Sequence, residues 1–190
     1  ADYCAAKQIE NLTEKGVIVG YPDGTFQPDD NVTRAEFASM AIKALGQEHT
    51  TVAQPVKFTD IEASFWAYDA IQKALYFDLI SCPPEGQPFR PDDTVTRGES
   101  ISVAVNALTT EQISKFKAKD VLSKKYADTD KIPEWFIIPA GKAEILNMLV
   151  TIPSKNKAEI KAERPETRAE VADILYEMTE QAKLNPNAKL

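Results

Sequence analysis

Apolar residues recur along this 190-residue chain at helical spacing, in pairs of runs separated by polar segments rich in proline and glycine. The pair in the middle of the chain is the most complete. Residues 84–93 separate its two runs, and Pro83 and Pro84 end the first, because proline has no amide hydrogen to donate. The pattern predicts a helix-loop-helix unit whose apolar stripes are Ile71, Leu75 and Leu79, then Ile101, Ala104, Val105 and Leu108.

The same organisation occurs three times. A short phrase opens the second helix of each unit: Val32-Thr33-Arg34-Ala35-Glu36, Val95-Thr96-Arg97-Gly98-Glu99 and Glu166-Thr167-Arg168-Ala169-Glu170. We therefore predict an all-α chain of three repeats, residues 1–46, 57–109 and 125–181, joined by linkers at 46–57 and 109–125. Residues 182–190 look like an outgoing linker, which suggests a larger parent protein. Repeated units of this kind are typical of interaction modules.

The three units are not equally complete. The second begins with Phe58-Thr59-Asp60 and Phe65-Trp66-Ala67, and the third with Tyr126-Ala127-Asp128 and then Trp135, whereas the first lacks such a head. In the third, the loop at 153–165 has lost its glycines and aromatics. We therefore expect the third unit to be degenerate in its loop and intact in its helices.

The threonine and glutamate of each phrase have a structural explanation. Thr-x-x-Glu before an apolar helix is a capping box, in which the threonine side chain accepts from the third helical amide and the glutamate reaches back to the cap amide. The residues that we assign to capping are Thr33, Glu36, Thr96, Glu99, Thr167 and Glu170.

Capping does not explain the arginine. It occupies the first helical position, where the helix dipole disfavours a cation by roughly 0.3–1 kcal/mol. Exposed amides at a helix start with a guanidinium beside them would form a receptor for a carboxylate or another anion. The alternative is an arginine that is solvated or paired with a loop aspartate such as Asp29 or Asp92.

The aromatic residues also have two interpretations. Trp66 and Trp135 stand at helix starts, where packing in the core is the usual role. Tyr21, Phe26 and Phe89 lie in loops, where they either anchor the loop to the helices or stack on a sugar. We expect anchoring.

The composition of the chain argues against several classes of function. A net charge of −7 argues against a nucleic-acid partner, and no run approaches the roughly 18 apolar residues of a membrane helix. The chain begins at Ala1 without a signal-type leader, so we expect that any signal peptide has been removed or lies outside this sequence. Cys4 and Cys82 either pair or stay free thiols, and with the single His49 they offer little for a metal site. We predict no metal site and no cofactor.

These residues together resemble the S-layer homology (SLH) domain family. The matching pattern is Phe-x-Asp, Trp-Ala, an apolar helix, Gly-Tyr-Pro-Asp-Gly-Thr-Phe-x-Pro and Thr-Arg-Ala-Glu. The first unit carries the last two elements almost unchanged at 20–26 and 33–36, and the second carries the head. A triple set is the usual arrangement in that family.

The resemblance implies a mostly helical, three-pronged spindle with pseudo-threefold symmetry. One helix of each unit would lie in a central bundle, and a second helix with its loop would form a prong. Grooves between prongs would bind cell-wall carbohydrate, either a secondary cell-wall polymer, often pyruvylated, or modified peptidoglycan.

The same resemblance implies an extracytoplasmic location, in the wall or on the periplasmic face of an outer membrane, without membrane insertion by this segment. The residues that it marks for ligand binding are Arg34, Arg97, Arg168, Gly20, Tyr21, Asp23, Gly24, Asp60, Trp66, Asp128 and Trp135. Because the third loop departs from the pattern, we rank Arg34 and Arg97 above Arg168.

Three other functions stay open. Asp23, Asp29 and Asp30, or Asp92 and Asp93, could hold calcium, although their spacing does not match an EF-hand. Paired carboxylates could serve a glycan-cleaving enzyme, but no pair stands out, so we expect no catalysis. A protein–protein scaffold is the remaining alternative, since helical repeats often serve that role.

Overall fold

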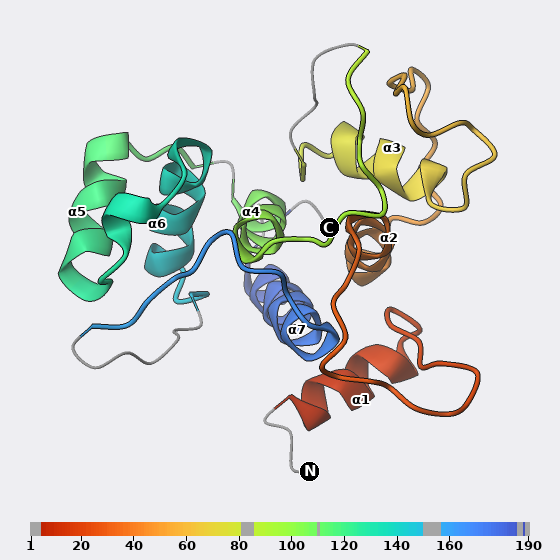
Figure 1. The fold of residues 1–190 in the computed structure, drawn as a ribbon, viewed down its shortest axis with the longest axis horizontal. Helices are drawn as coiled ribbons and strands as arrows, with labels where there is room; N and C mark the ends of the chain where they lie inside the picture. The colour runs from red at the N-terminus through yellow and green to blue at the C-terminus, as the bar shows by residue number, and fades with distance from the viewer. Residues whose placement is uncertain (1–4, 81–85, 110, 150–156, 186–187, 189–190) are drawn as a thin grey trace.

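The computed structural model describes residues 5–80, 86–109, 111–149, 157–185 and 188, and the secondary structure in these ranges is helical, as predicted (Figure 1). Cys4 and Cys82 lie outside the described residues. The helices are α1 (Ala6–Glu14), α2 (Arg34–Ala44), α3 (Tyr68–Tyr76), α4 (Arg97–Leu108), α5 (Lys115–Lys125), α6 (Ile137–Ile145) and α7 (Arg168–Leu184), with two short 3₁₀ helices, η1 (Thr129–Lys131) and η2 (Glu134–Phe136).

Each predicted unit contains its two helices: α1 and α2, α3 and α4, α6 and α7. The segment at 109–125, predicted as a linker, instead contains α5. Ser114 caps this helix by accepting from the Lys117 amide, and Ala118 and Leu122 are its buried residues. Two apolar positions among so many lysines are too few to show a helical pattern in the sequence. Helix α7 also continues to Leu184, past the predicted end of the third unit.

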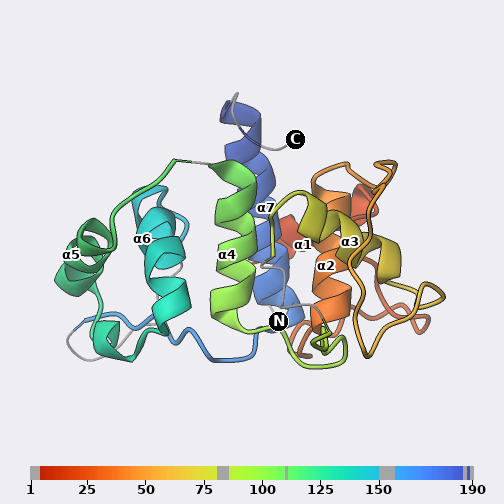
Figure 2. The same cartoon turned by 90° about the horizontal axis from the view of Figure 1, so that it is seen from above.

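The helices pack in a cyclic order that the chain order does not reveal. The first helix of each unit packs on the second helix of the preceding unit: α3 on α2, α6 on α4, and α1 on α7. Helix α7 also contacts α4 and α2. Figures 1 and 2 show α2, α4 and α7 in the middle, with the remaining helices around them. The units are thus interlocked, while the spindle shape as a whole stays a prediction.

Three backbone hydrogen bonds close the units into a ring. The Val95 amide donates to the Val32 carbonyl (2.8 Å), the Glu166 amide to the Val95 carbonyl (3.1 Å), and the Val32 amide to the Glu166 carbonyl (3.2 Å). These residues each precede the threonine of a repeated phrase. We call this set of three bonds the ring.

The helix starts next to the ring have their amides occupied. All three predicted capping boxes are present, so each threonine accepts from the third helical amide. The first two amides of each helix donate to loop carbonyls of another unit; Arg34 and Ala35, for example, donate to Asp93 and Pro91 at 2.9 and 3.0 Å. The prediction of exposed amides that receive an anion is therefore wrong.

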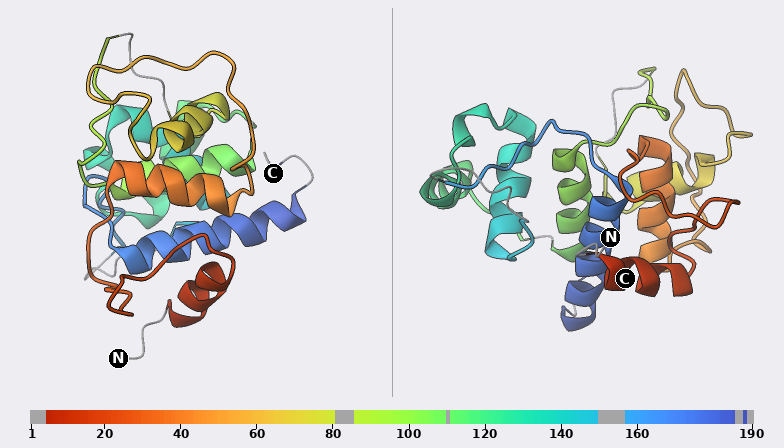
Figure 3. Two further views of the ribbon diagram at one scale, coloured as in Figure 1. Left: turned by 90° about the vertical axis from the view of Figure 1, so that its right-hand side faces the viewer. Right: turned by 60° about the horizontal axis from the view of Figure 1, so that its bottom comes forward.

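One apolar core runs through all three units. Its fully buried members include Leu12 of α1, Leu108 of α4, Phe136 of η2 and Leu175 of α7. Figure 3 shows α7 lying along α2, with α1 against α7, which agrees with the contacts between these helices. A core shared in this way means that no unit buries its apolar face alone.

The aspartates in the heads of the second and third units hold the loops that follow. The Asp60 carboxylate accepts from the amides of Phe89 (2.8 Å) and Arg90 (2.6 Å). Asp128 accepts in the same way from Ile160 (3.0 Å) and Lys161 (2.8 Å). These two predicted ligand residues therefore have a structural task in the described contacts.

Replacing Asp128 by alanine should destabilise the protein by about 2–3 kcal/mol, because two loop amides lose a charged acceptor. Asp130→Ala is the matched control: Asp130 is exposed in the adjacent 3₁₀ helix, and its loss should change stability by less than about 0.5 kcal/mol. Urea unfolding followed by circular dichroism measures both. Equal effects of the two variants would contradict the loop-holding role.

Glu166 brings a carboxyl group into the interior beside the ring. Its side chain is 2 % exposed and pairs with Arg97 at 3.2 Å. Burial raises the pKa of Glu166 to about 7, although the Ser100 hydroxyl and the Arg97 guanidinium act to lower it. The other charged neighbours are Glu170 and Arg164. Because the folded-state pKa lies above the ordinary value, the folded protein binds more protons than the unfolded chain between about pH 4.5 and pH 7.

Stability should therefore fall as the pH rises through this range, and Glu166→Gln should remove that fall. We expect the unfolding free energy of the variant, relative to the unsubstituted protein, to increase by up to about 3 kcal/mol from pH 5 to pH 8. Titrations of other groups cancel in the difference. A difference between the two proteins that does not change with pH would contradict the raised pKa.

Candidate functional site

The three repeated arginines share one contact that ties the units together. Each donates from Nε to a loop carbonyl of the next unit in the cycle: Arg34 to Phe89 (3.1 Å), Arg97 to Ile160 (3.0 Å) and Arg168 to Phe26 (2.8 Å). The remaining guanidinium atoms differ in their surroundings, and this difference separates the three positions.

Arg97 is a buried structural residue. Its side chain is 5 % exposed and is paired with the buried Glu166. Removing one member of a buried ion pair leaves the other charge uncompensated, which costs about 3–5 kcal/mol. The contacts of Arg97 therefore lie in the interior beside the ring and not on an open surface.

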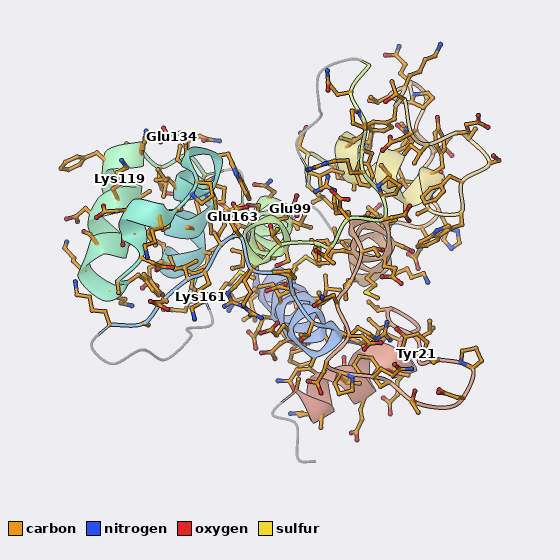
Figure 4. All side chains as sticks on the ribbon, in the orientation of Figure 1. Tyr21, Glu99, Lys119, Glu134, Lys161 and Glu163 are labelled. Carbon is orange, nitrogen blue, oxygen red and sulfur yellow. The ribbon has the colours of Figure 1, made fainter. Side chains whose placement is uncertain are left out.

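Arg168 serves the first loop. Its Nη2 donates to the Val19 carbonyl (2.7 Å), and its guanidinium lies over the rings of Tyr21 (4.9 Å) and Phe26 (4.6 Å). These contacts agree with the expected anchoring role of the loop aromatics. Figure 4 shows Tyr21 far from Glu99 and Glu163, on another part of the molecule.

The other predicted ligand residues of the first loop form a tight turn. A Cβ at Gly20 would come within 2.9 Å of the Thr25 carbonyl oxygen, and Gly24 has a φ of +82°. Asp23 accepts from both the amide (2.9 Å) and the hydroxyl (2.7 Å) of Thr25. Hydrogen bonding to the Thr25 side chain and amide lowers the pKa of Asp23. The backbone therefore requires glycine at both positions, at Gly20 because of the close carbonyl and at Gly24 because of the positive φ.

Arg34 is the most exposed of the three repeated arginines. Its guanidinium lies 4.8 Å from the centre of the Phe89 ring and pairs with Glu99, whose side chain is 28 % exposed. The partner is thus the capping-box glutamate of the next unit, and not Asp29 or Asp92. This ion pair stands at the junction of two cavities between α2 and α4.

The two cavities adjoin each other, and we call the pair of them the α2/α4 groove. They share Arg34, Glu99 and Trp135. The outer part, the mouth, has a volume of about 410 Å³ and is lined by these three residues with Arg90, Asp93, Thr94, Thr96 and Glu163. The inner pocket has a volume of about 330 Å³ and is lined by the same three with Phe37, Ala38, Ala41, Ala74, Leu79, Ile80, Phe89, Val95, Ser102, Val103, Asn106 and Pro139. All three units contribute.

Trp135 reaches this groove from the third unit. Its side chain is on η2 and half exposed, and a Cβ at Gly98 would come within 3.0 Å of the ring. Gly98 thus lets the indole lie close to α4. Trp66, which is 63 % exposed, is not among the groove-lining residues. The expectation that both tryptophans pack in the core is wrong.

The mouth offers an aromatic face among charged groups of both signs. Arg34 pairs with Glu99 and Arg90 with Asp93 (3.4 Å), and Glu163 adds a further carboxylate. Glu99 and Glu163 lie near each other in Figure 4. Donors and acceptors around an exposed indole suit a ligand with many hydroxyl groups and one apolar face, as in a sugar ring.

Sequence reasoning missed Arg90 and Glu163 and considered Asp93 only as a calcium ligand, because only the cyclic packing brings these loop residues to the same place. Within the described residues, no three histidine, cysteine, aspartate or glutamate side chains cluster closely enough to hold a metal ion. Nor does the described part of the chain contain a helix long and apolar enough to cross a membrane.

Comparison with known proteins agrees with this architecture. The family model described as "S-layer homology domain" matches residues 2–38 and 57–99, the regions that contain α1 and α3 and lead into α2 and α4. An amylopullulanase of Thermoanaerobacterium thermosulfurigenes is 28 % identical over 95 % of this chain and 9 % of its own length.

Two shorter matches are more similar. A cellulosome-anchoring protein of Acetivibrio thermocellus is 36 % identical over 55 % of this chain and 24 % of its own length. A surface layer protein of Brevibacillus choshinensis is 30 % identical over 56 % of this chain and 10 % of its own length. The chain thus corresponds to a small part of each of these relatives. By their repeated phrases, their helices and these matches, residues 2–38 and 57–99 of the chain belong to the S-layer homology domain family.

Proposed function

We propose that this chain is a non-catalytic anchoring module of the cell envelope that binds cell-wall carbohydrate in the α2/α4 groove. The observation that carries the proposal is the mouth of the groove, where a half-exposed Trp135 from one unit faces the Arg34–Glu99 pair formed by the other two. Membership of the S-layer homology family supports the anchoring role, and the names of relatives that are surface-layer and cellulosome-anchoring proteins agree with it.

The chemistry of the mouth suits a sugar. The indole of Trp135 offers a flat apolar surface to a sugar ring, and the carboxylates of Glu99 and Glu163 accept hydrogen bonds from hydroxyl groups. Arg34 contributes donors at the same place. Apart from Trp135, the lining of the mouth consists of charged side chains and threonines, so it offers hydrogen-bonding groups on every side of the ring.

Arg34 also supports a finer proposal, that the wall carbohydrate is acidic. Candidates are a secondary cell-wall polymer, often pyruvylated, and modified peptidoglycan. A carboxylate of the ligand would replace Glu99 as the partner of Arg34, since guanidinium groups bind carboxylates in bidentate geometry. Arg97 and Arg168 would then support the fold while Arg34 contacts the ligand.

The proposed location is extracytoplasmic, at the wall or surface layer, and the chain would attach a larger protein there. The matched relatives extend far beyond the segment that they share with this chain, with 9–24 % of their lengths covered in the three cases above. The rest of such a protein would be the cargo.

Replacing Trp135 by alanine should weaken binding to wall sacculi at least about tenfold, because the ring loses its contact with the sugar face. Phe116→Ala is the matched control, since Phe116 is an 84 % exposed aromatic on α5 that does not line the groove. Sedimentation of each variant with purified sacculi measures the affinity, and circular dichroism verifies the fold.

Two further arms of the same experiment separate the alternatives. Sacculi stripped of their attached polymer should lose binding if the polymer is the ligand, and retain it if peptidoglycan is. A failure of the unsubstituted protein to bind either form would refute wall anchoring and favour a protein–protein scaffold. Equal binding by the Trp135 and Phe116 variants would place the site elsewhere.

A further inference from the structure

Helix α5 is an addition to the repeated pattern of the three units. It lies between the second and third units, whereas the corresponding linker at 46–57 forms no helix. The residues that the family model matches also exclude it. Helix α5 packs on α6, with Ala118 and Leu122 buried, and forms the outer edge of the third unit in Figures 1 and 2. Neither the ring nor the core explains the side chains on its exposed face.

This exposed face concentrates positive charge on an acidic protein. Helix α5 carries five lysines and one aspartate in 11 residues, whereas the whole chain has a net charge of −7. All five lysines are exposed. We call them the α5 basic surface: Lys115, Lys117, Lys119, Lys124 and Lys125.

The position of two of these lysines does not serve the stability of the helix. Lys115 and Lys117 lie in the first turn of α5, where the helix dipole disfavours a cation and where no acidic residue is present. Ion pairs with carboxylates occupy three of the five lysines: Lys115 with Glu134, Lys124 with Asp120 and Lys125 with Glu144. Within the described residues, neither Lys117 nor Lys119 forms an ion pair. The surface therefore keeps an excess of positive charge.

Glu134 connects the α5 basic surface to the mouth of the groove. It directly precedes Trp135 in η2, and its carboxylate pairs with Lys115. A hydrogen bond from Lys115, together with the charge of Lys119, lowers the pKa of Glu134, so both lysines lie close to this carboxylate. Figure 4 shows Glu134 and Lys119 on the α5 side of the molecule. A polymer that leaves the mouth past Trp135 would therefore reach the α5 basic surface.

The residue type indicates the kind of partner. A lysine ammonium is a point charge on a flexible stem, and it binds an anionic group without the fixed planar geometry of arginine. Several such charges on one helix attract a chain of negative charges, over a range of about 10 Å at 0.1 M salt. Because the protein as a whole is acidic, this attraction has to be local. The surface thus suits a polymer with repeated anionic groups.

We propose that the α5 basic surface binds anionic repeat units of the wall polymer whose sugar the mouth holds. This inference rests on the proposed function and adds a second contact outside the groove. The mouth contacts one sugar through Trp135, while the lysines contact the charged units that follow it along the polymer. Two contacts on one rigid body strengthen attachment, because the second forms at a high effective concentration once the first is made.

The double variant Lys117→Gln/Lys119→Gln tests the proposal. It removes two charges that form no ion pair with the described residues, and glutamine has nearly the helix propensity of lysine. The matched control is Lys7→Gln/Lys15→Gln, which removes two exposed lysines at the ends of α1, far from α5 in Figure 1. Both variants have the same net charge. Phe116→Ala should leave this contact intact, since it changes no charge.

Sedimentation with purified wall sacculi measures the affinity, and circular dichroism verifies the fold. In about 50 mM salt, we expect the α5 variant to bind at least about fivefold more weakly than the α1 variant. Raising the salt to about 200 mM should reduce this difference, because salt screens exposed charges. Lys117→Arg/Lys119→Arg should bind normally, since it keeps both charges. On sacculi stripped of their attached polymer, the α5 and α1 variants should not differ.

Three results would overturn the inference: equal binding of native sacculi by the two glutamine variants in low salt, a difference that salt does not change, or a difference that persists on stripped sacculi. If Trp135→Ala still lost binding in those cases, the groove would remain the wall-binding site and the α5 contact alone would be refuted. No binding of native sacculi by the unsubstituted protein would refute both proposals.

Discussion

The rest of this structure depends on one constraint, a closed cycle of three backbone hydrogen bonds that joins the three units. The amides and carbonyls of Val32, Val95 and Glu166 form the ring, and the second helix of each unit begins two residues later. Because each bond joins two units, the ring fixes where all three helices start. The first amides of those helices then donate to loops of the neighbouring units, so the ring also sets the positions of the loops.

The candidate site depends on this ring and on a difference in how the three helices that it joins pack against one another. Helix α7 packs against both α2 and α4, and the α2/α4 groove lies between these two helices. The Nε contact of Arg34 fixes its guanidinium at that groove, and the loop that accepts this hydrogen bond is held by Asp60. Trp135 arrives from the third unit. A site with walls from three units therefore depends on a closed ring.

The helical class and the capping boxes could be predicted from the sequence, because both depend on local spacing. Helix α5 was missed, since only Ala118 and Leu122 are buried along a lysine-rich segment. The roles of the three repeated arginines differ because their partners are distant in the sequence. Arg97 meets Glu166, where the other two units have valine, and a partner 69 residues away is not visible in local patterns. The exposure of Trp135 likewise depends on packing between units.

The ring is tested most directly by native-state hydrogen exchange of its three amides, those of Val32, Val95 and Glu166. If the ring joins the units into one cooperative structure, these amides should all exchange with the free energy of global unfolding. The amide of Gly24, in an exposed turn, should exchange by local fluctuation and serves as the internal control. Exchange of one ring amide at a much lower free energy than the other two would contradict the closed ring and, with it, a groove that needs all three units.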